Sequence, residues 1–220
     1  MAEQGADGCV LMFVKDPQPG KVKTRMVPRL GEAGAAALAR HLAETVGDCL
    51  QRGAQWPVVV CTDNPDSEWC QRFAKTRQFT LMTQGEGSLG DRMHRCAKRA
   101  LETHQKVIIV GSDCDGYDPL YLAAARSALA HHDVVIGPAR DGGYVLIGVT
   151  RLPKALFDDI AWGTDRVFAA QCRQFELLGI RYKTLPMRQD IDVPADLEHL
   201  EGPPPFGGDP FSSKRDRIRR

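Results

Sequence analysis

Short apolar runs alternate with longer amphipathic stretches along most of the chain. Runs such as Val10–Val14 and Val107–Val110 are continuously apolar, which is typical of strands buried on both faces of a parallel sheet. In one of the stretches between them, Leu38, Leu42 and Val46 recur at four-residue steps and mark a helix with one apolar face. The pattern predicts strands at Cys9–Val14, Pro57–Cys61, Phe79–Thr83, Val107–Gly111, Val134–Gly137, Tyr144–Val149 and Arg181–Leu185. It predicts helices at Gly31–Arg52, Asp66–Lys75, Leu89–Thr103, Pro119–His131, Asp165–Leu178 and Ala195–Leu200.

The order of these elements predicts one α/β domain. Strand Tyr144–Val149 follows strand Val134–Gly137 with no room for a helix, so we expect an antiparallel strand in a mostly parallel, mixed sheet. The predicted fold is a single-domain, Rossmann-like three-layer α/β/α sandwich. A length of 220 residues suits one such domain. We expect a flexible N-terminus over residues 1–7, the domain over 8–201, and a tail over 202–220.

Charge is nearly balanced over the whole chain, with 29 lysines and arginines against 28 aspartates and glutamates. This balance argues against a protein that binds nucleic acid or an anionic membrane by bulk electrostatic attraction. The charge is unevenly distributed, however. The tail has a net charge of +3 and leaves the remaining chain at −2. Because the tail is rich in proline and glycine and lacks periodicity, we expect it to be disordered and solvated.

No stretch is long enough to predict a membrane span, which needs roughly 20 apolar residues. The first seven residues contain two acids and no basic residue, unlike a secretory signal. We therefore expect a cytoplasmic protein. The seven cysteines form no Cys-x-x-Cys pair, so we expect reduced, mostly buried thiols rather than a disulfide framework. Oligomeric state is left open.

The loop Lys15–Arg25 concentrates positive charge between the first strand and the first long helix. Ligands of open α/β sheets bind at the carboxyl ends of the strands, where loops rich in cations and glycine hold phosphates. Pro17 and Pro19 stiffen the loop. It is not a Walker A loop, because Val22 stands where that motif needs serine or threonine. The candidate phosphate-binding residues are Lys15, Gly20, Lys21, Lys23 and Arg25. A merely solvated loop is the alternative.

Gly85–Gly90 matches Gly-x-Gly-x-x-Gly between a predicted strand and a predicted helix. A dinucleotide-binding fingerprint has this form, but it belongs to the first strand–helix connection, and this is the third. We favour a loop that lets the backbone approach a base or ribose, with a plain turn as the alternative.

Two acids follow the strand Val107–Gly111. Asp113 and Asp115 lie two residues apart in a glycine-flanked turn, where their carboxylates could converge on Mg²⁺ or Mn²⁺. Asp118 suits the N-cap of the helix that begins at Pro119. The turn therefore predicts a metal site, with helix capping as the alternative for one acid.

Two further segments place acids after strands. Asp141 lies in a glycine-rich turn that could line a pocket or simply connect a hairpin. Asp190 and Asp192 follow the last strand. Either of these two could complete a metal site with Asp113, and Asp192 could instead cap the next helix.

Together these motifs resemble the bacterial glycosyltransferase-like, or selenodomain-associated, transferases of the nucleotide-diphospho-sugar transferase (GT-A) superfamily, over about residues 8–200. The resemblance rests on Lys15–Arg25, Gly85–Met93, Gly111–Gly116, Gly137–Tyr144, Trp162–Asp165 and Asp190–Leu197. The family usually has proline where this chain has Asp115.

The resemblance implies roles for particular residues. The Lys15–Arg25 loop would wrap nucleotide phosphates, and the Gly85–Arg92 segment would face the base and ribose through residues that include Gly87, Gly90 and Arg92. Asp113 would be the divalent-metal ligand, and Asp192 stands where related nucleotidyltransferases place a second one.

The hypothesis is a transferase that uses Mg²⁺ or Mn²⁺ and acts on a nucleotide-sugar or a nucleoside triphosphate. Lys23 and Arg25 would stabilise charge on the phosphates, and Asp141 would serve as base for an acceptor in sugar transfer. Nucleotidyl transfer with release of pyrophosphate is the alternative. Two alternatives belong to other functional classes: an NAD(P)-dependent oxidoreductase and a non-catalytic nucleotide-binding protein.

Overall fold

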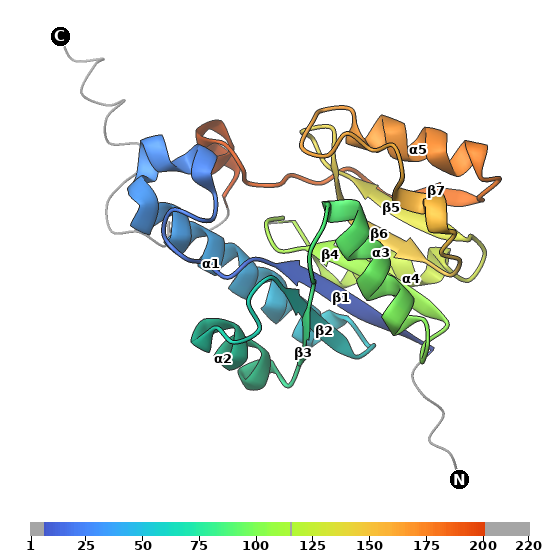
Figure 1. Ribbon diagram of the computed structural model, residues 1–220, viewed down its shortest axis with the longest axis horizontal. Coiled ribbons are helices and arrows are strands. Elements are labelled where there is room, and N and C mark those ends of the chain that lie inside the picture. Colours follow the sequence, from blue (N-terminus) through green and yellow to red (C-terminus); the bar gives the residue numbers. More distant parts are fainter. Residues whose placement is uncertain (1–6, 115, 201–220) are drawn as a thin grey trace.

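A central sheet with helices on both faces forms the molecule, in a computed structural model that describes residues 7–114 and 116–200 (Figure 1). The predicted disordered tail, Asp115 and all but the last residue of the predicted flexible N-terminus lie outside the described residues. The strands are β1 (Gly8–Val14), β2 (Val58–Thr62), β3 (Thr80–Thr83), β4 (Lys106–Gly111), β5 (Val134–Pro138), β6 (Tyr144–Val149) and β7 (Tyr182–Thr184). The α-helices are α1 (Val27–Gly53), α2 (Glu68–Arg77), α3 (Leu89–Ala100), α4 (Pro119–Ala128) and α5 (Val167–Leu177), and the 3₁₀ helices are η1 (Thr24–Met26), η2 (Lys154–Phe157) and η3 (Pro194–His199).

The described strands form one mixed sheet in the order β3-β2-β1-β4-β6-β5-β7. Strand β1 pairs in parallel with β2 on one side and β4 on the other. Strand β6 is antiparallel to both β4 and β5, as its short connection predicts. The carboxyl ends of β1 and β4 therefore lie next to each other, and the loops that follow them meet at one edge of the sheet.

Each face of the sheet has its own apolar core, because successive side chains of a strand point to opposite faces. On β1, Val10 and Met12 pack toward α1, α2 and α4, whereas Leu11 and Phe13 pack toward α3, η2 and α5. All seven residues of β1 are buried. The predicted three-layer α/β/α sandwich is confirmed.

The predicted helices differ from the structure mainly at their ends. Helix α1 begins at Val27, but Gly31 breaks it with φ 69° and ψ 169°, a left-handed backbone that favours glycine. The main body of α1 thus starts where the apolar periodicity predicted. The last predicted helix, Ala195–Leu200, is wrong in type, because Pro194–His199 forms a 3₁₀ helix. Helices η1 and η2 were not predicted, since such short pieces carry no periodic pattern.

Replacing Leu146, which is fully buried in β6, with alanine should lower the free energy of unfolding by about 2–5 kcal/mol, through lost burial and the cavity left behind. The matched control is Leu177→Ala, at a leucine that is 80% exposed, where we expect less than about 0.5 kcal/mol. Urea denaturation followed by circular dichroism measures both. Equal losses at the two positions would contradict the assigned core.

Candidate functional site

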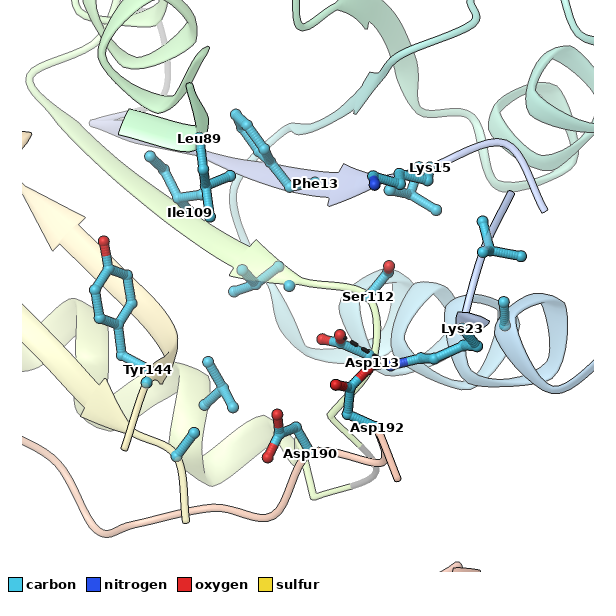
Figure 2. A pocket seen from close by; sticks show the side chains of 18 of the residues that line it. Phe13, Lys15, Lys23, Leu89, Ile109, Ser112, Asp113, Tyr144, Asp190 and Asp192 are labelled. Carbon is cyan, nitrogen blue, oxygen red and sulfur yellow. Dashed lines mark hydrogen bonds and ion pairs between the residues drawn. The ribbon is translucent and has the colours of Figure 1, made fainter. Parts of the chain in front are cut away.

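A pocket of about 510 Å³ opens at the carboxyl ends of β1 and β4. Phe13, Leu89, Ile109 and Tyr144 lie at one end of it, and acidic and basic side chains lie at the other (Figure 2). One end therefore offers apolar surface to a ligand, and the other offers charge.

An ion group holds the charged end together. The Lys23 ammonium donates to Asp113 Oδ2 at 3.1 Å and to Asp192 Oδ1 at 3.3 Å. Arg25 donates from Nη1 to Asp192 Oδ2 at 2.9 Å. Four predicted site residues that are as much as 169 positions apart in the chain are thus in direct contact. Figure 2 shows Lys23, Asp113 and Asp192 of this group.

Burial makes these contacts strong at Lys23 and weaker at Arg25. The Lys23 side chain is only 8% exposed, whereas that of Arg25 is 61% exposed. Burial acts to lower the pKa of Lys23, but the carboxylates of Asp113 and Asp192 outweigh it and raise that pKa above its ordinary value. In turn the Lys23 ammonium holds the pKa of Asp113 below its ordinary value. Lys23 and Asp113 are therefore both charged at neutral pH.

A small apolar cluster brings the two chain segments of the ion group together. Met26, next to Arg25, and Ile191, next to Asp192, are both fully buried and pack with Leu38 and Leu42 of α1. Burying these neighbours sets the position of the charged side chains that flank them.

A buried carboxylate organises the start of the basic loop. Asp16 is 7% exposed and accepts hydrogen bonds from Gln18 Nε2 (2.6 Å), Asn64 Nδ2 (3.0 Å) and Ser67 Oγ (2.7 Å). Its backbone N–H donates to Asp63 Oδ1 at 2.8 Å. This network ties the loop after β1 to the loop after β2. It could not be found from sequence, because its members gather only when β1 and β2 pair.

Gln84 is a second buried polar residue that the motifs missed. It is 2% exposed and lines the pocket. Its Nε2 donates to the Cys61 carbonyl at 2.8 Å, and its Oε1 accepts from Arg92 Nη1 at 2.7 Å. Gln84 thus holds the Arg92 guanidinium at the wall of the pocket. Its place directly before the Gly85–Gly90 motif was the available signal.

The two other acids of the pocket, Asp141 and Asp190, lie in different surroundings from the carboxylates of the ion group. Asp141 is exposed, and its Oδ1 accepts from the Gly143 N–H at 2.7 Å, which shapes the turn before β6. Asp190 is partly buried. Burial, together with the neighbouring carboxylates of Asp141 and Asp113, raises the pKa of Asp190 to about 7.

The predicted glycines do not line the pocket, although Lys15, Lys21 and Arg92 do. Gly20 and Gly87 have φ of 76° and 102°, so they permit left-handed turns. A Cβ at Gly90 would lie 3.0 Å from the Cβ of Phe157, so this glycine lets α3 pack closely against η2. Asp118 caps α4, since its Oδ1 accepts from the Tyr121 N–H at 2.8 Å.

The carboxylate pair suits a divalent cation that also binds phosphate. Because Asp113 and Asp192 each place an oxygen within 3.3 Å of one nitrogen, their oxygens converge on a point that a cation occupies. No group of three or more histidines, cysteines, aspartates and glutamates able to hold a metal occurs in the described residues. Mg²⁺ is commonly held by one or two carboxylates, with the remaining positions taken by phosphate oxygens and water.

The cysteines agree with the prediction of buried thiols, since six are buried and Cys172 is partly buried, and none forms a disulfide. In residues 7–114 and 116–200, no helix is long and apolar enough to cross a membrane.

Residues 45–164, more than half of the chain, match the family described as uncharacterized proteins conserved in bacteria (DUF2064). The chain belongs to this family. Phosphoenolpyruvate guanylyltransferase from Sphaerobacter thermophilus is 27% identical over 188 residues, which cover 84% of this chain and 89% of that protein.

Two solved structures extend the comparison. A protein from Desulfovibrio desulfuricans G20, assigned as a nucleotide-diphospho-sugar transferase, is 29% identical over 97% of this chain and 96% of its own, with a TM-score of 0.81. Glucosyl-3-phosphoglycerate synthase from Mycobacterium tuberculosis, in complex with Mn²⁺ and uridine diphosphate, has a TM-score of 0.55 and 13% identity over 89% of this chain and 75% of its own. The second likeness shows the fold alone. The chain is an enzyme of the transferase class, and its relatives support a nucleotide-diphospho-sugar transferase or a nucleotidyltransferase.

Replacing Asp16 with alanine should loosen the basic loop, because three hydrogen-bond donors lose their acceptor. We expect a loss of about 1–3 kcal/mol in the free energy of unfolding and faster tryptic cleavage after Lys21 and Lys23. Urea denaturation and timed proteolysis measure the two effects. Asp66→Ala, at an exposed aspartate near the same network, is the control, and equal cleavage rates in the two variants would contradict the role of Asp16.

Proposed function

We propose that the protein is a metal-dependent transferase that binds a nucleotide through its phosphates at the charged end of the pocket. One observation carries the proposal: Asp113 and Asp192 converge on one point, which the ammonium of Lys23 from the basic loop occupies. We also propose that it belongs to the selenodomain-associated branch, on the motifs set out above.

The proposed Mg²⁺ or Mn²⁺ site consists of Asp113 and Asp192. A divalent cation there supplies charge neutralisation for the phosphates. Lys15, Lys21 and Arg25 reach the same pocket from the loop after β1 and would stabilise charge that develops on the phosphate oxygens. Such contacts speed the reaction only where they are stronger in the transition state than in the bound substrate.

Nucleotidyl transfer is the form of the reaction that we favour, because the relative with the guanylyltransferase name matches most of both chains. An acceptor phosphate oxygen attacks the α-phosphorus, the bond from that phosphorus to the bridging oxygen of the β-phosphate breaks, and pyrophosphate leaves with the bonding electrons. Arg92, held by Gln84, lies in the same pocket and would contact the base or ribose.

Sugar transfer is the second candidate, favoured by the similarity to the Desulfovibrio protein. In that reaction the acceptor hydroxyl oxygen bonds to the sugar carbon that carries the diphosphate, the bond from that carbon to the diphosphate oxygen breaks, and a nucleoside diphosphate leaves with the bonding electrons. Asp141, which lines the pocket, would then take the proton of the acceptor hydroxyl. The apolar end formed around Phe13, Ile109 and Tyr144 remains for the rest of either substrate.

Replacing Asp113 or Asp192 with alanine should weaken metal-dependent nucleotide binding by at least about tenfold, the scale seen when metal sites lose a supporting contact. A thermal-shift series with nucleoside triphosphates, nucleotide-sugars and NAD(P), each with and without Mg²⁺ or Mn²⁺, measures the effect. Asp158→Ala removes an exposed aspartate on another part of the surface and should leave the shifts unchanged. If Asp113→Ala retains the full metal-dependent shift, the proposed site is wrong.

Product analysis separates the two reactions. With GTP and phosphoenolpyruvate as the first substrates, chosen from the name of the guanylyltransferase relative, nucleotidyl transfer releases pyrophosphate. Sugar transfer instead releases a nucleoside diphosphate from a nucleotide-sugar. Ion-exchange chromatography of reactions with a panel of both donor types detects either product, and release of neither from the whole panel would count against the proposed activity.

A further inference from the structure

The Lys23 ammonium occupies the point on which the carboxylate pair converges. It lies 3.1 Å from Asp113 and 3.3 Å from Asp192, and Figure 2 shows it reaching both carboxylates from the basic loop. A divalent cation bound by the same two oxygens would have to take over these contacts. The ammonium and the metal ion therefore compete for one pair of ligands.

Burial makes this competition severe. The Lys23 side chain is 8% exposed, so its charge depends on the carboxylates rather than on water for stabilisation. A divalent cation placed between Asp113 and Asp192 would remove that stabilisation and add a like charge beside the buried ammonium. Breaking a buried ion pair on one side only is strongly unfavourable. Metal binding alone thus leaves the ammonium without compensation.

Phosphate oxygens can supply that compensation. A lysine ammonium has three rotatable donors on a flexible four-carbon stem, so Lys23 can exchange carboxylate for phosphate oxygens without movement of the whole loop. Its backbone is already confined, with φ 45° and ψ 43°, a left-handed conformation that persists in a non-glycine residue only where its surroundings enforce it. The confined backbone keeps the ammonium near the pair in both arrangements.

We propose that Lys23 is the resident cation of the carboxylate pair, and that the site accepts a divalent cation only together with nucleotide phosphates that take over the ammonium. This inference rests on the proposed function. The ligand-free protein would then bind a metal–nucleotide complex rather than the free metal ion. Because binding couplings are reciprocal, the nucleotide and the metal each strengthen the binding of the other.

Binding of Mn²⁺, measured by electron paramagnetic resonance without any nucleotide, tests the proposal. Wild-type protein should bind free Mn²⁺ weakly, and Lys23→Met should bind it at least about tenfold more tightly, a difference of about 1.4 kcal/mol. Lys75→Met removes the same charge from an exposed position on α2, outside the pocket, and should match the wild type. The double variant Lys23→Met,Asp113→Asn should lose this gain in affinity for Mn²⁺. Lys23→Gln repeats the test if the methionine variant does not fold, and circular dichroism checks each variant.

Equilibrium dialysis with ATP, CTP, GTP and UTP in turn provides the second arm. Wild-type protein should retain a nucleotide only when Mn²⁺ is present. If the wild type binds free Mn²⁺ tightly, with an affinity within about threefold of that of Lys23→Met, the inference is wrong. The proposed function still stands in that case if nucleotide binding depends on the metal. An equal gain in Lys75→Met would also overturn it, because the effect would then come from overall charge. If no variant binds Mn²⁺ and no nucleotide is retained, both proposals fail.

Discussion

The parallel pairing of β1 with β4 is the constraint on which the site depends. In this pairing Phe13 lies opposite Gly111, so the basic loop and the turn that contains Asp113 leave the sheet side by side. Neither segment could form the charged end of the pocket alone. The loop supplies cations that need compensation, and the turn supplies a carboxylate that needs a counter-charge. Pairing two central strands, which is driven by burial of their apolar side chains, places these opposite charges in contact.

The second carboxylate of the pair, Asp192, comes from the chain segment after β7. Strand β7 lies at the far edge of the sheet, separated from β4 by β5 and β6. The chain then returns along the carboxyl edge, where Arg188 N–H donates to the Pro138 carbonyl at 2.9 Å and Ile191 N–H donates to the Asp113 carbonyl at 3.0 Å. These backbone bonds carry Asp192 back to Asp113. The charged end of the pocket is thus built from three segments that the sheet brings together.

Local patterns predicted much of this arrangement. The predicted strands lie within one residue of the observed strands at either end. Continuous apolar runs marked β1 and β4, because strands buried on both faces tolerate few polar side chains, whereas the edge strands β3 and β7 contain polar, exposed positions. The cations of the basic loop and Asp113 stood out since they follow such runs directly. Gln84 and Asp16 did not stand out. Each is polar and nearly fully buried, and some of the partners that make this burial favourable lie far away in the chain, such as Ser67 for Asp16 and the Cys61 carbonyl for Gln84. No single window of sequence therefore shows why these residues are buried.

The residue pattern alone determined the α/β fold class. It also determined that the near-neutral total charge is the sum of a basic loop and two acidic segments. Only the tertiary structure decided how those charges combine. Lys23, which the sequence predicts to bind nucleotide phosphates, lies buried between Asp113 and Asp192 in the structure. The physical reason is that charge is a property of each residue, whereas compensation of a buried charge depends on distances of a few ångströms between segments far apart in the chain. Those distances exist only after the sheet has formed.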